Sequence, residues 1–330
     1  MAADSVERIG IDGETPEGRN SAYLIDDRVV VDPGPPTEDA WADLRAGLER
    51  AGVAVTDLET VLVTHWHADH AGLAPRLADA AGASIAMGAG DAPLVEDYAA
   101  ERTRRLERDR ETMCRWGVPD DAVDRIVARD TPSPMPDSVP VNRLAGGDRV
   151  AGLEVVPTPG HTLGHTAFAW ADVLFVGDAI LPTYTPNVGG SDTRTLAGGA
   201  TPATGASTES GRRPPVPDPL ATFLETLERL EERPERLLPG HGTTIDPDRI
   251  DEIRAHHRSR SRRVLDALRR HRAPDGRDGT TPWRLAVDLF GDLEGIHVKF
   301  GAGEVAAHCR RLERDGIVDR ADDDPVRYEP

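Results

Sequence analysis

The sequence contains almost no lysine. Lys299 is the only lysine among 330 residues, so arginine supplies nearly all of the positive charge, and the formal net charge is −19. Such an acidic balance argues against a surface that binds nucleic acid in general. It is typical of proteins from salt-loving microbes, and a GC-rich genome is the alternative explanation that stays open.

Cysteine and long apolar runs are also scarce. Cys114 and Cys309 are the only cysteines and neither belongs to a CxxC pair, so we interpret both as small buried apolar residues. The first 18 residues are polar and acidic and lack the apolar core of an export signal. No run of 18 apolar residues occurs, which predicts no membrane span. These absences predict a cytoplasmic protein without membrane contact.

Histidine, in contrast, is concentrated in residues 64–70, Thr-His-Trp-His-Ala-Asp-His, which follow the apolar run Val61-Leu62-Val63. Three imidazoles and a carboxylate within six residues are typical of a metal site. His65 and His67 leave a strand end on the same side, whereas Asp69 and His70 lie where the chain turns into a helix. The pattern predicts two ligand pairs that face two neighbouring ions.

This stretch resembles the HxHxDH signature of the metallo-β-lactamase superfamily. Later residues match the rest of that pattern in order: His161 in Pro-Gly-His-Thr, Asp178 in Val-Gly-Asp and His241 in Pro-Gly-His-Gly. The resemblance covers roughly residues 6–245 and depends on these four separate motifs. It implies one metal held by His65, His67 and His161, a second held by Asp69, His70 and His241, and a bridging Asp178.

Two further residues receive supporting roles. In the family, the aspartate that matches Asp32 lies close under the metal site, so we expect it to contact a ligand. The alternative is a turn aspartate that hydrogen-bonds its own backbone. The resemblance assigns the metal to His161, which leaves His165 as a supporting or structural residue.

The implied fold is α+β, a four-layer αβ/βα sandwich over residues 1–248. Within it, we expect residues 93–129 to form a helical insertion and residues 191–217, which hold hardly any large apolar residue, to form a flexible loop. Alternation of apolar residues predicts a hairpin from Ala22 to Asp32 across Asp26-Asp27, and a strand over residues 60–64 that delivers the histidines. The spacing after them predicts a helix over 71–81.

Residues 249–330 differ in character from the rest. The patterns predict a long helix to about His271, helices over 282–290 and 304–314, and a hairpin from Gly316-Ile317-Val318 and residues 325–328. This order resembles a winged helix. Such a tail on this fold resembles the subfamily that includes a mitochondrial single-stranded-RNA endonuclease. Residues 250–330 hold 16 basic and 16 acidic side chains, so the acidic excess lies in residues 1–249, with 23 basic and 42 acidic.

The resemblance implies hydrolysis by a hydroxide that bridges two divalent metal ions, with Asp69 as the ligand that orients it. Zinc is the first choice, and iron or manganese would also suit these ligands. The leading hypothesis is a small ester or thioester substrate, as in the hydroxyacylglutathione hydrolase (glyoxalase II) branch, although this chain lacks that enzyme's helical glutathione-binding tail. The alternatives are a single-stranded-RNA endonuclease and a mononuclear iron sulfur dioxygenase. RNA and a homodimer remain open as partners.

Overall fold

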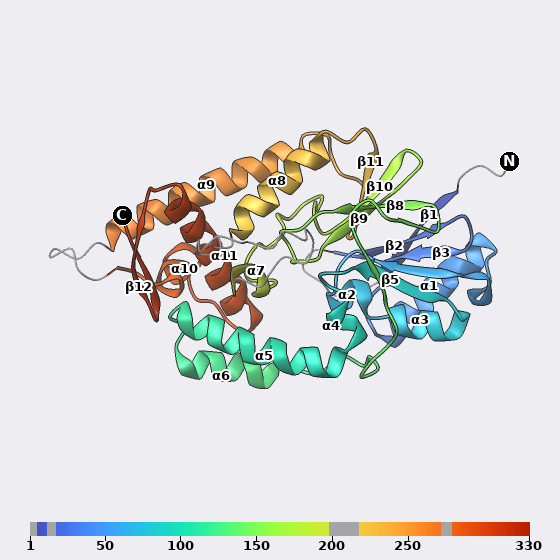
Figure 1. Cartoon of the computed structure of the whole chain (residues 1–330), viewed down its shortest axis with the longest axis horizontal. Coiled ribbons are helices and arrows are strands. Elements are labelled where there is room, and N and C mark those ends of the chain that lie inside the picture. Colours follow the sequence, from blue (N-terminus) through green and yellow to red (C-terminus); the bar gives the residue numbers. More distant parts are fainter. Residues whose placement is uncertain (1–4, 12–17, 198–217, 272–278) are drawn as a thin grey trace, which may run out of the picture. The chain divides into compact units, whose positions relative to one another are not determined.

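The computed structural model describes residues 5–11, 18–197, 218–271 and 279–330. The chain divides into two compact units (Figure 1). Unit 1 comprises Met1–Arg102, Pro132–Pro186 and Thr226–Arg249, and unit 2 comprises Thr103–Thr131, Asn187–Glu225 and Ile250–Pro330. Each unit is described by itself.

Unit 1 contains two β-sheets. The first has the order β1-β2-β3-β4-β5-β6, with strands Val6–Ile11, Asn20–Ile25, Val29–Val31, Thr60–Val63, Ser84–Gly88 and Asn142–Leu144. The second has the order β11-β10-β9-β8-β7, with strands Arg236–Pro239, Val173–Gly177, Thr166–Trp170, Leu153–Pro157 and Arg149–Val150. Apolar side chains of both sheets share one core, in which Tyr23 and Leu62 of the first sheet pack with Phe168 and Phe175 of the second.

The outer face of the first sheet is covered by helices α1 (Glu38–Ala51) and α3 (Ala74–Ala81), which share a second core with β1 and β4 (Figure 1). Local signals fix the ends of α1. The Thr37 side chain accepts a hydrogen bond from the Ala40 backbone N–H, and Gly52 closes the helix in the left-handed conformation. These features produce a mixed α+β sandwich.

The hairpin predicted across Asp26-Asp27 is confirmed, because β2 and β3 pair antiparallel around a turn at residues 26–28, in which both aspartates have positive φ. The single helix predicted over 71–81 is wrong. Helix α2 (Ala68–Ala71) ends at Gly72, where an added Cβ would lie 2.2 Å from Pro36 Cδ, and α3 starts again at Ala74 with a proline in its first turn. Close packing and the missing N–H of Pro75 therefore divide the helix.

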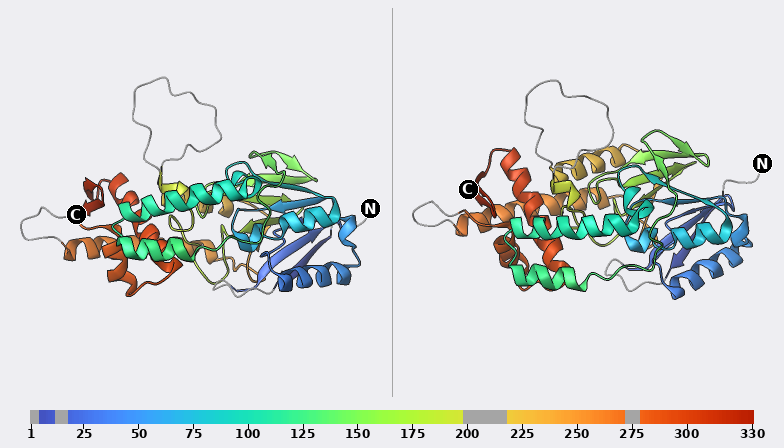
Figure 2. Two further views of the ribbon diagram at one scale, coloured as in Figure 1. Left: turned by 90° about the horizontal axis from the view of Figure 1, so that it is seen from below. Right: turned by 60° about the horizontal axis from the view of Figure 1, so that its bottom comes forward.

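Unit 2 is mainly helical. It contains most of α5 (Tyr98–Arg115), α6 (Asp120–Arg129), α7 (Arg194–Ala197), the first part of α8 (Pro219–Glu231) and α9 (Arg249–Arg270), followed by α10 (Pro282–Phe290), α11 (Ile296–Arg314) and a hairpin of β12 (Asp319–Asp323) and β13 (Val326–Glu329). Helices α5 and α6 lie side by side (Figure 2), joined by a 2.6 Å ion pair between Arg110 and Asp124. Short α4 (Pro93–Glu96) precedes them in unit 1.

Three expectations for unit 2 need correction. Helix α11 begins at Ile296 rather than at 304, because Gly301 and Gly303 pack closely: a Cβ on Gly303 would lie 2.4 Å from Gly190 Cα. The first hairpin strand lies at Asp319–Asp323 rather than 316–318. The first part of the expected loop 191–217 is ordered, since Ser191, Asp192 and Thr193 are buried and α7 follows; residues 198–217 lie outside the described ranges.

The two cysteines differ in their surroundings. Cys309 is fully buried in the core of unit 2, as expected, whereas Cys114 is partly exposed.

The order helix, helix, helix, hairpin over residues 249–330 is present, and its interpretation as a winged helix stays a prediction. None of the helices in the described ranges has both the length and the apolar character that a membrane span needs.

Candidate metal centre

The carboxyl ends of four strands of unit 1 bring the seven predicted site residues together. The segment after β4 carries His65 and His67, and α2 carries Asp69 and His70. His161 follows β8, Asp178 follows β10 and His241 follows β11. Their side-chain atoms form three groups, each with all ligand atoms within 4.8 Å of one another. The first cluster is His65, His67 and His161, and the second cluster is Asp69, His70 and His241. The remaining group, His65, His70 and Asp178, connects these two clusters.

The first cluster consists of three imidazole nitrogens. Nδ1 of His67 lies 2.9 Å from Nε2 of His65 and 3.1 Å from Nε2 of His161. Nitrogens that bind zinc in a tetrahedron at about 2.0–2.1 Å are themselves separated by roughly 3.3 Å. The three nitrogens thus have the spacing of one face of such a tetrahedron.

The second cluster combines two imidazoles with a carboxylate. Oδ2 of Asp69 lies 3.3 Å from Nε2 of His241 and 3.5 Å from Nε2 of His70. Asp69 is the more accessible member, with 27% of its side chain exposed, while the two histidine side chains are buried. This cluster therefore presents its carboxylate toward solvent.

Asp178 lies between the two clusters and directs a different oxygen at each. Its Oδ1 lies 3.4 Å from Nε2 of His70 and 3.7 Å from Nε2 of His241, whereas its Oδ2 lies 3.8 Å from Nε2 of His161. A carboxylate in this position can bind two cations at once, one with each oxygen.

Two buried polar atoms indicate that a group belongs between these side chains. Nε2 of His70 and Oδ1 of Asp178 face each other without hydrogen-bond geometry, and neither forms a hydrogen bond with any other residue of the described ranges. Unsatisfied buried polar atoms are costly, and a cation would satisfy both. Nitrogen and carboxylate donors suit divalent zinc, iron or manganese, so the residues fit the predicted metals.

Asp32 orients ligands of both clusters. Its Oδ2 accepts a hydrogen bond from Nδ1 of His70 at 3.1 Å and from the Thr64 hydroxyl at 2.7 Å, and its Oδ1 accepts from the Thr64 backbone N–H at 2.8 Å. Because the Thr64 hydroxyl donates to Asp32, its oxygen is left to accept from Nδ1 of His65 at 3.1 Å. Both histidines thus carry their proton on Nδ1 and direct the Nε2 lone pair at the site. The structure thus places Asp32 in contact with a predicted ligand, as expected, and its supporting role stays a prediction.

Hydrogen bonds also hold two residues of the second cluster, His241 and Asp69. Nδ1 of His241 lies 3.1 Å from the carbonyl oxygen of Gly18, so it donates and leaves Nε2 for a metal. The Asn20 side chain donates to the backbone carbonyl of Asp69 at 2.9 Å. The first residue of β2 and the chain just before it thereby hold the second cluster.

Both ring nitrogens of His165 are occupied. Nδ1 lies 2.7 Å from the Thr158 hydroxyl, and Nε2 accepts a hydrogen bond from the Asp178 backbone N–H at 3.2 Å. His165 is thus a supporting residue that fixes Asp178, in agreement with the sequence-based expectation.

Burial lowers the pKa of His65 well below its usual value. Burial, followed by the nearby charge of His161, lowers the pKa of His67 to about 3. A neutral imidazole is the form that binds a metal, so these two side chains need not lose a proton at neutral pH before they bind.

In the second cluster, the pKa of His70 shifts in the opposite direction. Burial opposes a charge on His70, but the carboxylates of Asp178 and Asp69 outweigh burial and raise its pKa well above the usual value. Burial also opposes ionisation of Asp178, yet His70 and His241 lower its pKa well below the usual range. The surroundings of His70 therefore favour a positive charge at this position.

One buried residue at the site has no recognisable signal in the sequence. Asp91 follows β5 and contacts both segments that carry the first cluster. No motif marks it, because an aspartate in Gly-Asp-Ala has the appearance of a turn residue. Only the position of this segment in the fold reveals the contacts.

A sandwich of two sheets, with clustered histidines and carboxylates at the strand ends, defines a class of metal-dependent enzyme. The sequence model of the metallo-beta-lactamase superfamily matches residues 15–242, and the chain belongs to this superfamily. It is a hydrolase of this fold. The seven residues occupy the arrangement that the resemblance implies, and their function as metal ligands stays a prediction.

One solved structure agrees with this fold over nearly the whole chain, and two further relatives match in sequence. A metallo-beta-lactamase family protein from Thermus thermophilus has a crystal structure with 27% identity and a TM-score of 0.72, and the match covers 98% of each chain. A beta-lactamase-like protein 2 homolog from Caenorhabditis elegans is 22% identical over 322 residues, which are 92% of this chain and 82% of that protein. A hydroxyacylglutathione hydrolase from Rhodopseudomonas palustris (strain BisA53) is 30% identical over 167 residues, 49% of this chain and 48% of that enzyme.

Proposed function

We propose that the protein is a dinuclear metal-dependent hydrolase that acts on a small ester or thioester. The observation that carries this proposal is Asp178, whose two oxygens face two different ligand clusters. One ion would be held by His65, His67 and His161, and the other by Asp69, His70 and His241. Two divalent ions, when bound, would supply Lewis acidity and an attacking hydroxide at neutral pH.

The chain's own residues would orient the reaction. Asp69 is the most accessible carboxylate of the site, and His70 and His241 outweigh its burial and lower its pKa well below the usual range. An ionised Asp69 can accept a hydrogen bond from the attacking water and direct its lone pair at the substrate. Asp69 is therefore the proposed catalytic residue.

The similarity to hydroxyacylglutathione hydrolase supports a thioester or ester substrate, since that enzyme shares 30% identity over the matched half. Glutathione itself is not part of the proposal, because the match covers only 49% of this chain and 48% of that enzyme. We also propose a winged-helix-like segment over residues 249–330, supported by its order of helix, helix, helix and hairpin.

A substrate screen tests the function. Protein loaded with zinc, iron or manganese is incubated with acyl thioesters, carboxylate esters, phosphodiesters and single-stranded RNA. We expect thioester or ester turnover that is lost in His67→Ala, whereas exchange of the exposed His297 for alanine leaves it unchanged. Turnover of RNA alone, lost in Asp69→Ala, would overturn the substrate class in favour of an endonuclease.

Metal analysis tests the number of ions separately. We expect two divalent ions per chain, because both clusters are complete. One iron per chain, together with oxygen consumption in the presence of a persulfide, would instead assign the mononuclear dioxygenase.

A further inference from the structure

We propose that Asp91 is a positioning residue that holds the first ligand cluster in shape. This inference rests on the proposed function, because it concerns the geometry of the three histidines that would hold one ion. Asp91 is fully buried, and it lies between the segment after β4 and the segment after β8. Those two segments carry all three histidines of the cluster.

The contacts of Asp91 use both of its oxygens. Oδ2 accepts hydrogen bonds from the Thr162 hydroxyl at 2.6 Å and from the Trp66 backbone N–H at 3.3 Å. Oδ1 accepts from the Gly164 backbone N–H at 2.8 Å. Trp66 stands between His65 and His67 in the chain, and Thr162 directly follows His161. One carboxylate thus accepts a hydrogen bond from a chain neighbour of every histidine in the first cluster.

The backbone around Asp91 is packed too closely to adjust. A Cβ on Gly164 would lie 2.2 Å from the Asp91 backbone nitrogen, and a Cβ on Gly90 would lie 2.8 Å from Gly164 Cα. Small residues here let the two segments touch, so Asp91 reaches its partners without intervening water. Asp32 and Asp91 therefore differ in their contacts: Asp32 contacts His70 directly, whereas Asp91 connects the two segments that carry the first cluster.

The test is the affinity of each metal site in Asp91→Asn, which keeps the shape of the side chain but replaces one acceptor with a donor. Loss of a supporting hydrogen bond typically weakens metal binding about 10- to 100-fold. We expect a loss of this size for one of the two ions in chelator competition, and an altered visible spectrum of the cobalt-substituted protein. The exposed Asp79→Asn serves as the matched control.

Thr162→Val removes the hydroxyl that donates to Oδ2 of Asp91 and keeps the volume, so it tests the same connection should Asp91→Asn fail to fold. Equal weakening of both ions, or a lower melting temperature with unchanged metal affinity and spectrum, would overturn the positioning role. A wild-type protein that binds no ion would overturn both this inference and the proposed function. Normal binding of two ions by both variants would overturn this inference alone.

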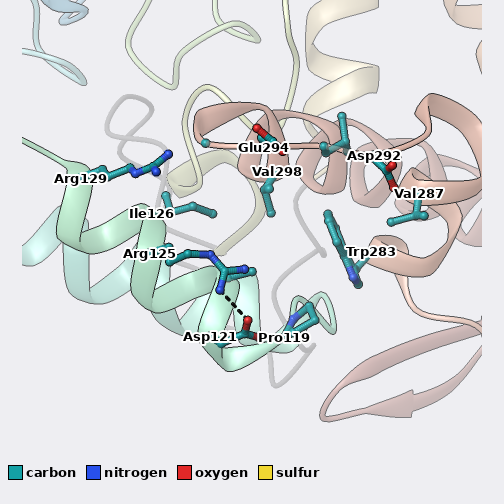
Figure 3. Close-up of a pocket in the computed structure, with 13 residues that line it drawn as sticks. Pro119, Asp121, Arg125, Ile126, Arg129, Trp283, Val287, Asp292, Glu294 and Val298 are labelled. Carbon is teal, nitrogen blue, oxygen red and sulfur yellow. Dashed lines mark hydrogen bonds and ion pairs between the residues drawn. The ribbon is translucent and has the colours of Figure 1, made fainter.

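A second inference comes from a groove within unit 2. The groove has a volume of about 510 Å³ and lies between α6 and the connection from α10 to α11 (Figure 3). Ile126 of α6 lines one wall, and Trp283, Leu293 and Val298 line the other. Ile296, next to the groove in the chain, is 47% exposed although it is a large apolar residue. A groove with apolar walls and an exposed apolar residue beside it in the chain is a candidate interaction site.

The charges at the rim of the groove are divided between its walls. Arg125 is occupied by Asp121 at 2.6 Å (Figure 3), but Arg129 on α6 and the pair Asp292 and Glu294 opposite form no ion pair with any residue that the structure describes. An acidic partner would be repelled by one wall and a basic partner by the other. A second copy of the same surface, rotated by 180°, places each positive wall against a negative one.

We infer that this groove is the contact between two copies of the chain in a homodimer. In that arrangement Arg129 of each copy pairs with Asp292 and Glu294 of the other, and Ile296 is covered. A standard interface buries roughly 800 Å² on each partner, so the contact extends beyond the groove onto the neighbouring helices.

Charge exchange tests the dimer by sedimentation velocity. Wild type should sediment as a dimer, whereas Arg129→Glu and the double variant Asp292→Arg/Glu294→Arg should each sediment as monomers. An equimolar mixture of the two variants should restore the dimer, because opposite charges meet again. Arg45→Glu, an exposed site in unit 1, is the control for the change in net charge.

Three outcomes would overturn the dimer at this groove. They are a monomeric wild type, variants that dimerise as wild type does, and a mixture that remains monomeric although both variants fold by circular dichroism.

Discussion

Nδ1 of His70 donates a hydrogen bond to Oδ2 of Asp32 at 3.1 Å, in a part of the protein where neither side chain reaches solvent. The same carboxylate accepts two hydrogen bonds from Thr64, which in turn contacts His65. Asp32 is therefore the one supporting carboxylate that reaches ligands of both clusters among the residues described.

Asp32→Ala should weaken binding of both ions and lower the free energy of unfolding. The substitution leaves the Thr64 N–H and the His70 Nδ1–H buried without an acceptor, at about 1–3 kcal/mol for each. Metal titration and urea unfolding measure the two effects. Asp91→Asn is the informative comparison, since it should affect one ion only. Two ions bound at wild-type affinity by Asp32→Ala would contradict this prediction.

Removal of the metal should lower the melting temperature. A ligand at 1,000 times its dissociation constant stabilises a protein by about 4 kcal/mol, which corresponds to a shift on the order of 10 °C. Calorimetry before and after dialysis against a chelator measures the shift, and added zinc should reverse it. In His67→Ala the shift should be smaller, because one cluster is incomplete. Equal melting temperatures with and without metal would show that these residues do not bind it tightly.

Acid should destabilise the protein through His257 of α9. Burial is the main reason that its pKa falls to about 4, with Glu304 opposing the change and His256 and Arg260 adding to it. Between pH 6.5 and about 4 the unfolded chain binds more protons at this residue than the folded chain, so the free energy of unfolding falls as the pH falls. The loss amounts to about 3 kcal/mol.

Urea unfolding as a function of pH measures this loss, and His257→Gln should flatten the profile in that range. His308, 3.4 Å from His257, has a pKa lowered to about 3 by burial and contributes in the same direction. An unchanged slope in His257→Gln would exclude His257 as the source.

The single lysine should be essential for the stability of unit 2. Nζ of Lys299 lies 2.7 Å from Oδ2 of Asp109, and both side chains are buried. Lys299→Met leaves Asp109 with Arg105 at 3.4 Å and the Thr193 hydroxyl, so removal of the cation should cost about 3–5 kcal/mol. Urea unfolding checks this, with the exposed Arg262→Met as the control.

Adding Asp109→Leu to Lys299→Met should restore part of that stability, because the buried carboxylate that lost its nearer cation is then removed. A further loss in the double variant would contradict this account.

Sequence patterns predicted elements whose signals are local. The turn at Asp26-Asp27, the strand that ends just before His65 and the apolar spacing of residues 282–290 each depend on neighbours in the chain, and the structure confirms all three elements. The patterns failed where a distant segment decides. Helix α11 extends through Gly301 and Gly303 because the segment at Gly190 packs against it, and no local rule favours glycine inside a helix.

The motifs along the chain determined which residues could bind metals, because imidazole and carboxylate groups are metal-binding donors by their residue type alone. The motifs suggested Asp32 and His165 as supports but not their contacts, and they did not mark Asp91. These contacts arise only where two sheets bring the end of β3, the end of β5 and the start of β9 beside the predicted ligands. The tertiary structure decided which nitrogen of His65, His70 and His241 faces the site, since each tautomer is set by hydrogen bonds that involve segments far away in the chain.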